Sequence, residues 1–328
     1  TIDEAYEVLL RAPLPVVAWP QLPQRVFYER SVVQASWGFP GLVLDEPQRR
    51  QYVEKAAAYA GLPSHTAAFL LHTPLPAAHW SPAEAAGMHA LVSGRVVLPD
   101  GCGVKGQLLG PVSLAAQLTD EQQQPLLLDS VLFEGLVVHT CLRARLQAEA
   151  LQSLQRPTII CLDEPFLDVM QSPFMTLDRE ELLFGLARVL EAIPVRRGLV
   201  VRSGTPVAPL VQLPLDVLVL THWDAASMSD ADYTALCDFL AAGHVLGVGI
   251  VERAAQQVEA VAQLCVIMKR FLSAGIAPAV LRAQLWVAPA QSLGQRAVAD
   301  AEDIIAATCA TAAAVRAWLD ESAAVSAV

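Results

Sequence analysis

The chain has 328 residues, a length that suits either one α/β barrel with insertions or two small domains and allows a large buried core. Hydrophobic residues make up 54% of it and the mean hydropathy is +0.41, but prolines and histidines interrupt the longest uncharged stretch, residues 56–83, so we expect no membrane span and no membrane partner. The formal net charge of −11 and the lack of a basic run disfavour nucleic acid as a partner.

The first residues and the cysteines indicate a cytoplasmic protein. Residues 1–10 have the pattern of an amphipathic helix and lack the charged segment followed by an apolar one that begins a secretory signal. The six cysteines are widely separated and form no Cys-x-x-Cys pair. We therefore expect reduced thiols rather than a disulfide framework or a cysteine metal site.

The first hundred residues are the least regular part of the chain. An apolar run at residues 14–19, followed by a proline-rich turn, predicts a first strand. Helical spacing follows over residues 27–36 and 48–60, and Gly61 and Pro63 are typical of a helix end. The apolar run at 67–71 then predicts a second strand. We expect residues 1–100 to contribute loops over the mouth of the fold.

A helix start and a glycine-rich passage come next. Ser81 and Glu84 have capping-box spacing, which predicts that a helix begins there. Residues 104–109 predict a third strand that ends in Gly110 and Pro111. Because the glycines match neither a dinucleotide-binding nor a P-loop pattern, a tight turn explains them better than a phosphate site. Asp129 is then expected to cap a long helix that reaches about residue 155.

Residues 157–167, PTIICLDEPFL, have the pattern of a buried parallel strand that ends in two carboxylates. Catalytic groups of α/β folds usually lie at the carboxyl ends of such strands, which makes Asp163 and Glu164 candidates for a functional site. A structural interpretation is also open at this point. Either carboxylate would also serve to cap the following loop or to pair with an arginine.

The remaining chain alternates short apolar runs with helical patterns. The runs lie at residues 199–202, 217–220, 245–251 and 284–287, and the helical patterns at 178–193, 229–241, 256–272 and 300–319. Together with the earlier runs this gives eight strands, which favours a closed (β/α)8 TIM barrel over an open doubly wound sheet. No internal repeat or linker interrupts the pattern, so a single domain is expected over residues 1–328.

Four segments carry a resemblance to a known family. Residues 19–23 (WPQLP), 104–114 (VKGQLLGPVSL), 162–167 (LDEPFL) and 247–251 (GVGIV) resemble, in this order, the catalytic barrel of cobalamin-independent methionine synthase. They are most similar to its short single-barrel relatives within the uroporphyrinogen decarboxylase and methionine synthase superfamily. The resemblance implies a methyltransferase that moves a methyl group to a thiol from a folate or a corrinoid protein. It also implies that Asp163 and Glu164, beside the Gly110 loop, bind the substrate.

The same resemblance implies a zinc site that this sequence does not reproduce. The family holds zinc, which makes a thiolate available, through a His-x-Cys pair, an acidic residue and a cysteine that follow three of the strands. The corresponding positions here are occupied by Val200, Arg202, Thr221 and Gln291. A side chain set of this kind does not bind zinc. We therefore expect a degenerate zinc site, no bound metal and no cofactor that the sequence itself identifies.

Three other residues are candidates near that position. His222 and Asp224 are two residues apart after a predicted strand, so their side chains would face the same way. They could act together as a general base or hold a metal, and the alternative is a structural hydrogen bond. Arg202 could hold a substrate carboxylate or pair with Glu164, and a salt bridge that only fills the vacated metal position is the alternative. No residue is singled out as catalytic.

Two classes of function follow from the sequence. The first is a methyltransferase-like barrel that binds an amino-bearing or otherwise cationic small molecule and activates it without zinc. The second is a non-catalytic member of the family that acts as a ligand-binding or assembly subunit, with a corrinoid protein or a catalytic paralogue as partner. A porphyrin decarboxylase is less well supported, because no arginine-rich substrate motif is present near the start.

Overall fold

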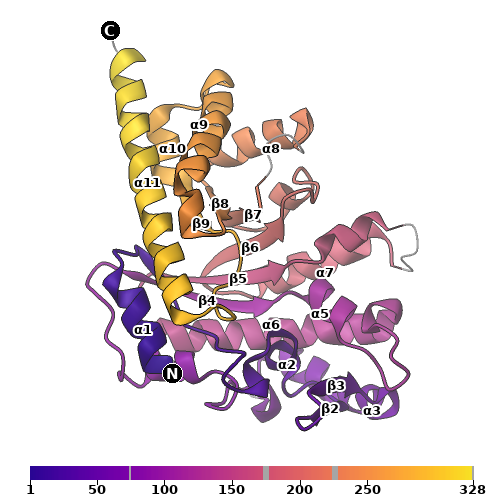
Figure 1. The fold of residues 1–328 in the computed structure, drawn as a ribbon. Helices are drawn as coiled ribbons and strands as arrows, with labels where there is room; N and C mark the ends of the chain where they lie inside the picture. Colours follow the sequence, from indigo (N-terminus) through magenta and orange to yellow (C-terminus); the bar gives the residue numbers. More distant parts are fainter. Residues whose placement is uncertain (74, 173–176, 224–227, 327–328) are drawn as a thin grey trace. The chain divides into compact units, whose positions relative to one another are not determined.

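Figure 1 shows the fold as a computed structural model, which describes residues 1–73, 75–172, 177–223 and 228–326. The described residues group into two compact units. Unit 1 comprises residues 1–6 and 15–198, and unit 2 comprises residues 7–14 and 199–328. A single domain over the whole chain stays a prediction.

The strands form a seven-stranded sheet and a two-stranded one. The order in the larger sheet is β1-β4-β5-β6-β7-β8-β9, and the pairs β1–β4, β4–β5, β7–β8 and β8–β9 are parallel. Its strands are β1 (Val16–Ala18), β4 (Gly103–Leu109), β5 (Thr158–Glu164), β6 (Arg196–Arg202), β7 (Val217–Thr221), β8 (Val245–Val251) and β9 (Leu285–Pro289). The parallel α/β class is confirmed. The closed (β/α)8 TIM barrel is wrong, because within the described residues the sheet has seven strands and is open.

The missing eighth strand is the segment predicted at residues 67–71. These residues belong to the end of helix α3 (Lys55–Leu70) and the turn after it, and β1 pairs directly with β4. Pro63 does not end this helix but lies inside it. Leu62 explains why the helix continues. It packs against Gly135 of helix α6 (Ser130–Gln152) so closely that a Cβ atom at residue 135 would lie 2.3 Å from Leu62 Cδ2. Packing outweighs the cost of one proline here.

The helix predicted at residues 48–60 is wrong in its first half for a similar reason. Residues from β3 (Arg50–Val53) pair antiparallel with β2 (Leu42–Asp45), and together they form the two-stranded sheet. The predicted helix start at Ser81 is also displaced. The backbone N–H of Ser81 does donate to Glu84 at 2.9 Å, but helix α4 begins only at Ala86 (Ala86–Val92).

Helix α6 covers one face of the sheet in unit 1, where it runs along β4 and β5 (Figure 1). It begins as predicted, because the side chain of Asp129 accepts a hydrogen bond from the backbone N–H of Leu132. The helix lies very close to β4, since a Cβ atom at Gly106 would lie 2.1 Å from Gln147 Oε1. Unit 1 also contains the short helices α2 (Ser31–Ser36) and α5 (Pro111–Gln117) and the longer helix α7 (Arg179–Glu191).

A buried arginine ties part of the irregular N-terminal segment to α6. The guanidinium of Arg143 is fully buried, lies 3.7 Å from the centre of the Trp80 ring and is 3.3 Å from Glu84 Oε1. It also donates to the backbone oxygens of Ala78, His79 and Gln34. A buried charge is tolerated only when it is paired and hydrogen-bonded in this way. Within unit 1 the segment therefore packs on a helix, through polar groups that a hydropathy pattern does not reveal.

Unit 2 carries β7, β8 and β9 with most of β6. Its helices are α8 (Asp230–Ala241), α9 (Gln257–Ser273), α10 (Pro278–Gln284) and α11 (Val298–Ser326), while α1 (Ile2–Arg11) has residues in both units. The long helix α11 packs along α9 and β9 (Figure 1). Within the described part of the chain, no helix combines the length and the apolar composition needed to cross a bilayer.

Candidate functional site

Glu164 lies at the carboxyl end of β5 and is fully buried. Its two carboxylate oxygens accept hydrogen bonds from the backbone N–H groups of Val112 at 3.0 Å and Ser113 at 2.7 Å. These N–H groups belong to the first turn of α5, where backbone donors have no partner within the helix. Glu164 therefore caps α5, a structural role, although the helix follows β4 and is not the loop after β5 that the sequence indicated.

Gly110 is brought against Glu164 and leaves no room for a side chain. A Cβ atom at residue 110 would lie 2.2 Å from Glu164 Oε1, although the backbone φ of −72° is one that any residue adopts. Ser113 completes the arrangement, because its hydroxyl oxygen accepts a hydrogen bond of 3.0 Å from the backbone N–H of Phe166. Two of the four segments that carry the resemblance, 104–114 and 162–167, thus contact each other, and this contact fixes the loops after β4 and β5.

Burial governs the protonation of both carboxylates. It raises the pKa of Glu164 to about 7, against the lowering effect of the hydrogen bonds from Ser113 and Val112. Desolvation also raises the pKa of Asp163, and the nearby positive charge of Lys105 lowers it in part. Asp163 differs from Glu164 in being half-buried rather than fully buried. Of the predicted pair, Asp163 is thus the carboxylate with exposed surface.

The positions that the resemblance assigns to zinc lie in unit 2, at or after the carboxyl ends of their strands. Arg202 is exposed at the end of β6, and the hydroxyl of Thr221, at the end of β7, donates to the backbone oxygen of Val201 at 3.2 Å. Gln291 is exposed after β9. Among the described residues, no three or more His, Cys, Asp or Glu side chains cluster as metal ligands would. The pairing of Arg202 with Glu164 stays a prediction.

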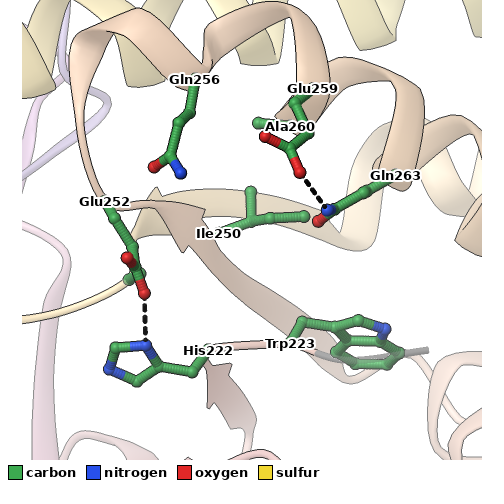
Figure 2. Close-up of a pocket in the computed structure, with 9 residues that line it drawn as sticks. His222, Trp223, Ile250, Glu252, Gln256, Glu259, Ala260 and Gln263 are labelled. Atoms are coloured by element: carbon green, nitrogen blue, oxygen red, sulfur yellow. Dashed lines mark hydrogen bonds and ion pairs between the residues drawn. The ribbon is translucent and has the colours of Figure 1, made fainter. Parts of the chain in front are cut away.

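His222 follows β7 directly and contacts a carboxylate from the neighbouring strand. Its Nδ1 atom lies 2.9 Å from Oε1 of Glu252, which comes immediately after β8 (Figure 2). Both side chains are only partly exposed, at 35% for His222 and 39% for Glu252. The backbone of His222 is left-handed, with φ of 52°, which is uncommon outside glycine and often marks a functional site. The two residues form an imidazole–carboxylate pair.

Backbone hydrogen bonds hold the three strand ends of this region together. The N–H of Trp223 lies 3.4 Å from the oxygen of Gly249, and the N–H of Ala290 donates to the oxygen of Val251 at 2.9 Å. The turn after β7, the end of β8 and the turn after β9 therefore meet at one edge. In parallel α/β sheets this is the edge at which ligands bind.

A cavity of about 230 Å³ opens beside the pair. His222 and Trp223 line one side of it, and Ile250 lies in its middle (Figure 2). Side chains from the segment after β8 and from α9 line the other side, namely Glu252, Gln256, Glu259, Ala260 and Gln263, and Ala290 completes the wall. The volume fits a small molecule of a few heavy atoms, and the polar groups supply both hydrogen-bond donors and acceptors.

The sequence predicted His222 but missed its partner. Asp224, the predicted partner, lies outside the described residues. The signal for Glu252 was present, because it is the first polar residue after the apolar run at 245–251, just as Asp163 ends the run in β5. Gln256, Glu259 and Gln263 could be found only from the packing of α9, since their spacing is that of an ordinary exposed helix face.

Trp223 lines this cavity and is itself nearly buried. Its side chain is 6% exposed, and its ring stands edge-on to Tyr233 with 6.4 Å between the ring centres. Tyr233 in turn lies under the guanidinium of Arg270, which is 3.4 Å from the ring centre. Trp223, held by this edge-on contact, supplies apolar surface to the cavity.

Comparison with known proteins gives a fold and no family. No protein-family model matches the sequence, and no curated protein matches it. Solved structures do match, and one of them is a methyltransferase from Methanosarcina mazei. The TM-score is 0.53 at 13% identity, and the alignment covers 94% of this chain and 82% of that chain. This likeness establishes a shared fold with a methyltransferase. The more specific resemblance to cobalamin-independent methionine synthase stays a prediction.

Proposed function

We propose that this protein transfers a methyl group to a small acceptor bound in the cavity beside His222, with His222 as the general base. The observation that carries the proposal is the contact between His222 Nδ1 and Glu252 Oε1 at 2.9 Å, at the edge of the sheet where ligands bind. The methyltransferase fold of the structural neighbour supports the reaction class. As predicted from the sequence, the donor is a methylated corrinoid protein or a methylated folate.

The chemistry assigns one task to each residue of the pair. Glu252 is a positioning residue, because its carboxylate accepts a hydrogen bond from Nδ1–H of His222. Nε2 of His222 is then the atom that takes up a proton. His222 removes the proton of the acceptor, whose electron pair then bonds to the methyl carbon. The bond between that carbon and the donor breaks, and its electron pair stays with the donor.

This proposal explains why the zinc ligands can be absent. Zinc activates an acceptor by lowering the pKa of its proton, and a positioned base achieves the same end by accepting the proton. The position corresponding to the acidic zinc ligand is Thr221, which directly precedes His222. The base therefore lies one residue beyond a vacated ligand position, on the same strand end.

Glu164 takes no part in substrate binding under this proposal, since both of its oxygens hold α5. Substrate binding by Asp163 and Arg202, and by the Gly110 loop, stays a prediction, as does any part that Asp224 plays beside His222.

The test is methyl transfer from isotopically labelled methylcobalamin, and separately from methyltetrahydrofolate, to a panel of small thiols and amines. His222→Gln should lower the turnover number by a factor on the order of 100 or more, which is the usual contribution of a general base. His244→Gln is the matched control. His244 belongs to the same unit but precedes β8, at the opposite end of the strand, and stacks on Phe239 with 4.6 Å between the ring centres.

Equal turnover of wild type and His222→Gln would overturn the assignment of the base. Elemental analysis of the purified protein provides an independent check. One zinc ion per chain would mean that other residues bind the family's metal, and it would restore zinc activation in place of His222.

The non-catalytic alternative is favoured by one observation, the use of Glu164 as a helix cap rather than as a free substrate ligand. It predicts a stable complex with a corrinoid protein or a catalytic paralogue. Recovery of the tagged protein from native lysate as monomer or homodimer alone would count against it, and methyl transfer by the purified chain would exclude it.

A further inference from the structure

The cavity beside His222 is lined by acidic and neutral side chains. Glu252 borders it at the end of β8 and Glu259 borders it on α9, so the two carboxylates approach the space from different elements (Figure 2). The described residues that line the cavity include no lysine and no arginine. The described lining residues therefore bring two carboxylates and no fixed positive charge to the cavity, in a chain whose formal net charge is −11.

The neutral side chains in the wall also suit a donor-rich ligand. Gln263 Nε2 donates to Glu259 Oε1 at 3.3 Å, which leaves the amide oxygen of Gln263 as an acceptor facing the same region. Gln256 adds a second carboxamide on the side of Glu252. Trp223, Ile250 and Ala260 supply apolar surface for a short carbon chain.

We infer that the acceptor is a small aliphatic amine, bound as its ammonium ion, rather than a thiol. This inference rests on the proposed function and names the substrate class of the same cavity. An ammonium group offers N–H donors to carboxylate and amide oxygens, and its positive charge is favoured beside the two carboxylates. A thiol must react as its anion, which two neighbouring carboxylates disfavour in the absence of a metal.

The reaction balances with the base already assigned. The ammonium ion gives one proton to His222, and the lone pair of the resulting amine attacks the methyl carbon of the corrinoid or folate donor. A nitrogen–carbon bond forms, and the bond between carbon and donor breaks with its electron pair on the donor. The product leaves as an N-methylammonium ion, and His222 returns its proton to water.

Binding can be measured on the full chain without knowing the donor. The probes are n-propylammonium and three molecules of similar size, namely n-propanethiol, n-propanol and propionate, each titrated by calorimetry at low ionic strength. The expected result is that n-propylammonium binds at least about tenfold more tightly than the other three, which corresponds to one or two charge-assisted hydrogen bonds. Equal or tighter binding of n-propanethiol or propionate would overturn the inference.

Variants locate the binding and test the role of charge. Glu259→Gln and Glu252→Gln should each weaken n-propylammonium binding by roughly fivefold, because ion pairs that are partly exposed contribute modestly. The binding of n-propanol should not change. Asp303→Asn is the control, since it removes an equal charge from an exposed position on α11. If Asp303→Asn weakens binding as much as Glu259→Gln does, the effect arises from net charge, and the proposed binding site beside Glu259 is wrong.

The outcomes separate this inference from the proposed function. Methyl transfer to thiols that depends on His222, with no transfer to amines, would overturn the amine as the acceptor class. It would leave the assignment of His222 as the general base standing. Tight binding of n-propylammonium that depends on Glu259, with turnover that does not depend on His222, would support the ligand class. It would overturn the assignment of His222 as the general base.

Discussion

Glu164 and Glu252 both lie at the carboxyl ends of parallel strands, yet their surroundings give them opposite roles. Glu164 is fully buried and both of its oxygens accept backbone N–H groups of α5. Glu252 keeps 39% of its side chain exposed and contacts an imidazole beside a cavity. The comparison teaches that the end of a strand provides a place for function, while the partners of each carboxylate decide what it does.

The largest expected effect concerns the packing of Gly110 against Glu164. Gly110→Ala would place a Cβ atom 2.2 Å from Oε1 of the fully buried Glu164. We expect a loss of about 3 kcal/mol or more in the free energy of unfolding, at the upper end for overpacked sites, measured by urea denaturation. An unchanged midpoint would mean that the loop is free to move and that Glu164 is available to a ligand.

The second prediction uses the pKa of Glu164. Because burial raises this pKa from 4.5 to about 7, the folded state holds the proton more tightly than the unfolded chain does, so stability is lost as the pH rises through this window. The wild type should therefore lose up to about 3 kcal/mol relative to Glu164→Gln between pH values of about 4.5 and 7.

Urea denaturation of both proteins across this pH range checks the prediction, and Asp303→Asn serves as the exposed control. A stability difference between wild type and Glu164→Gln that does not vary with pH would show that the hydrogen bonds from α5 keep Glu164 ionised throughout.

The third prediction concerns the partner of His222. Glu252→Gln keeps a hydrogen-bond acceptor near Nδ1 but removes the carboxylate charge from this contact, so we expect turnover to fall about tenfold. The free energy of unfolding should change by less than about 0.5 kcal/mol, because the pair is partly exposed. A large loss of stability with unchanged turnover would make this contact structural, like that of Glu164.

Much of the fold could be predicted from local patterns. Asp129 caps α6, Ser229 caps α8, and Asp178 forms a capping box with Glu181 at the start of α7, because each of these signals acts within one turn of a helix. The prediction of a strand at residues 67–71 was wrong because contacts with α6 extend α3 past Pro63. Contacts of that kind join residues far apart in the sequence, and the error removed the eighth strand of the expected barrel.

The candidate site likewise has residues that strand position predicts and others that depend on contacts between distant segments. His222 was predicted because it follows an apolar strand, and Asp163 and Glu164 were predicted for the same reason. Strand position alone could not reveal that Glu164 caps α5, since the donors belong to residues 112 and 113 in another loop. Nor could it reveal Glu259 as part of a cavity wall, because that depends on the placement of α9 over β8.

The central claim is that ligand chemistry takes place at the His222–Glu252 cavity and not at the Asp163–Glu164 pair. Hydrogen–deuterium exchange with and without saturating n-propylammonium tests it most directly, because it maps binding along the whole chain. We expect slower exchange in peptides that cover residues 220–223 and 250–263, and no change in peptides that cover 110–114 and 161–167. Protection confined to the latter peptides would contradict the account and return the substrate to the carboxylate pair.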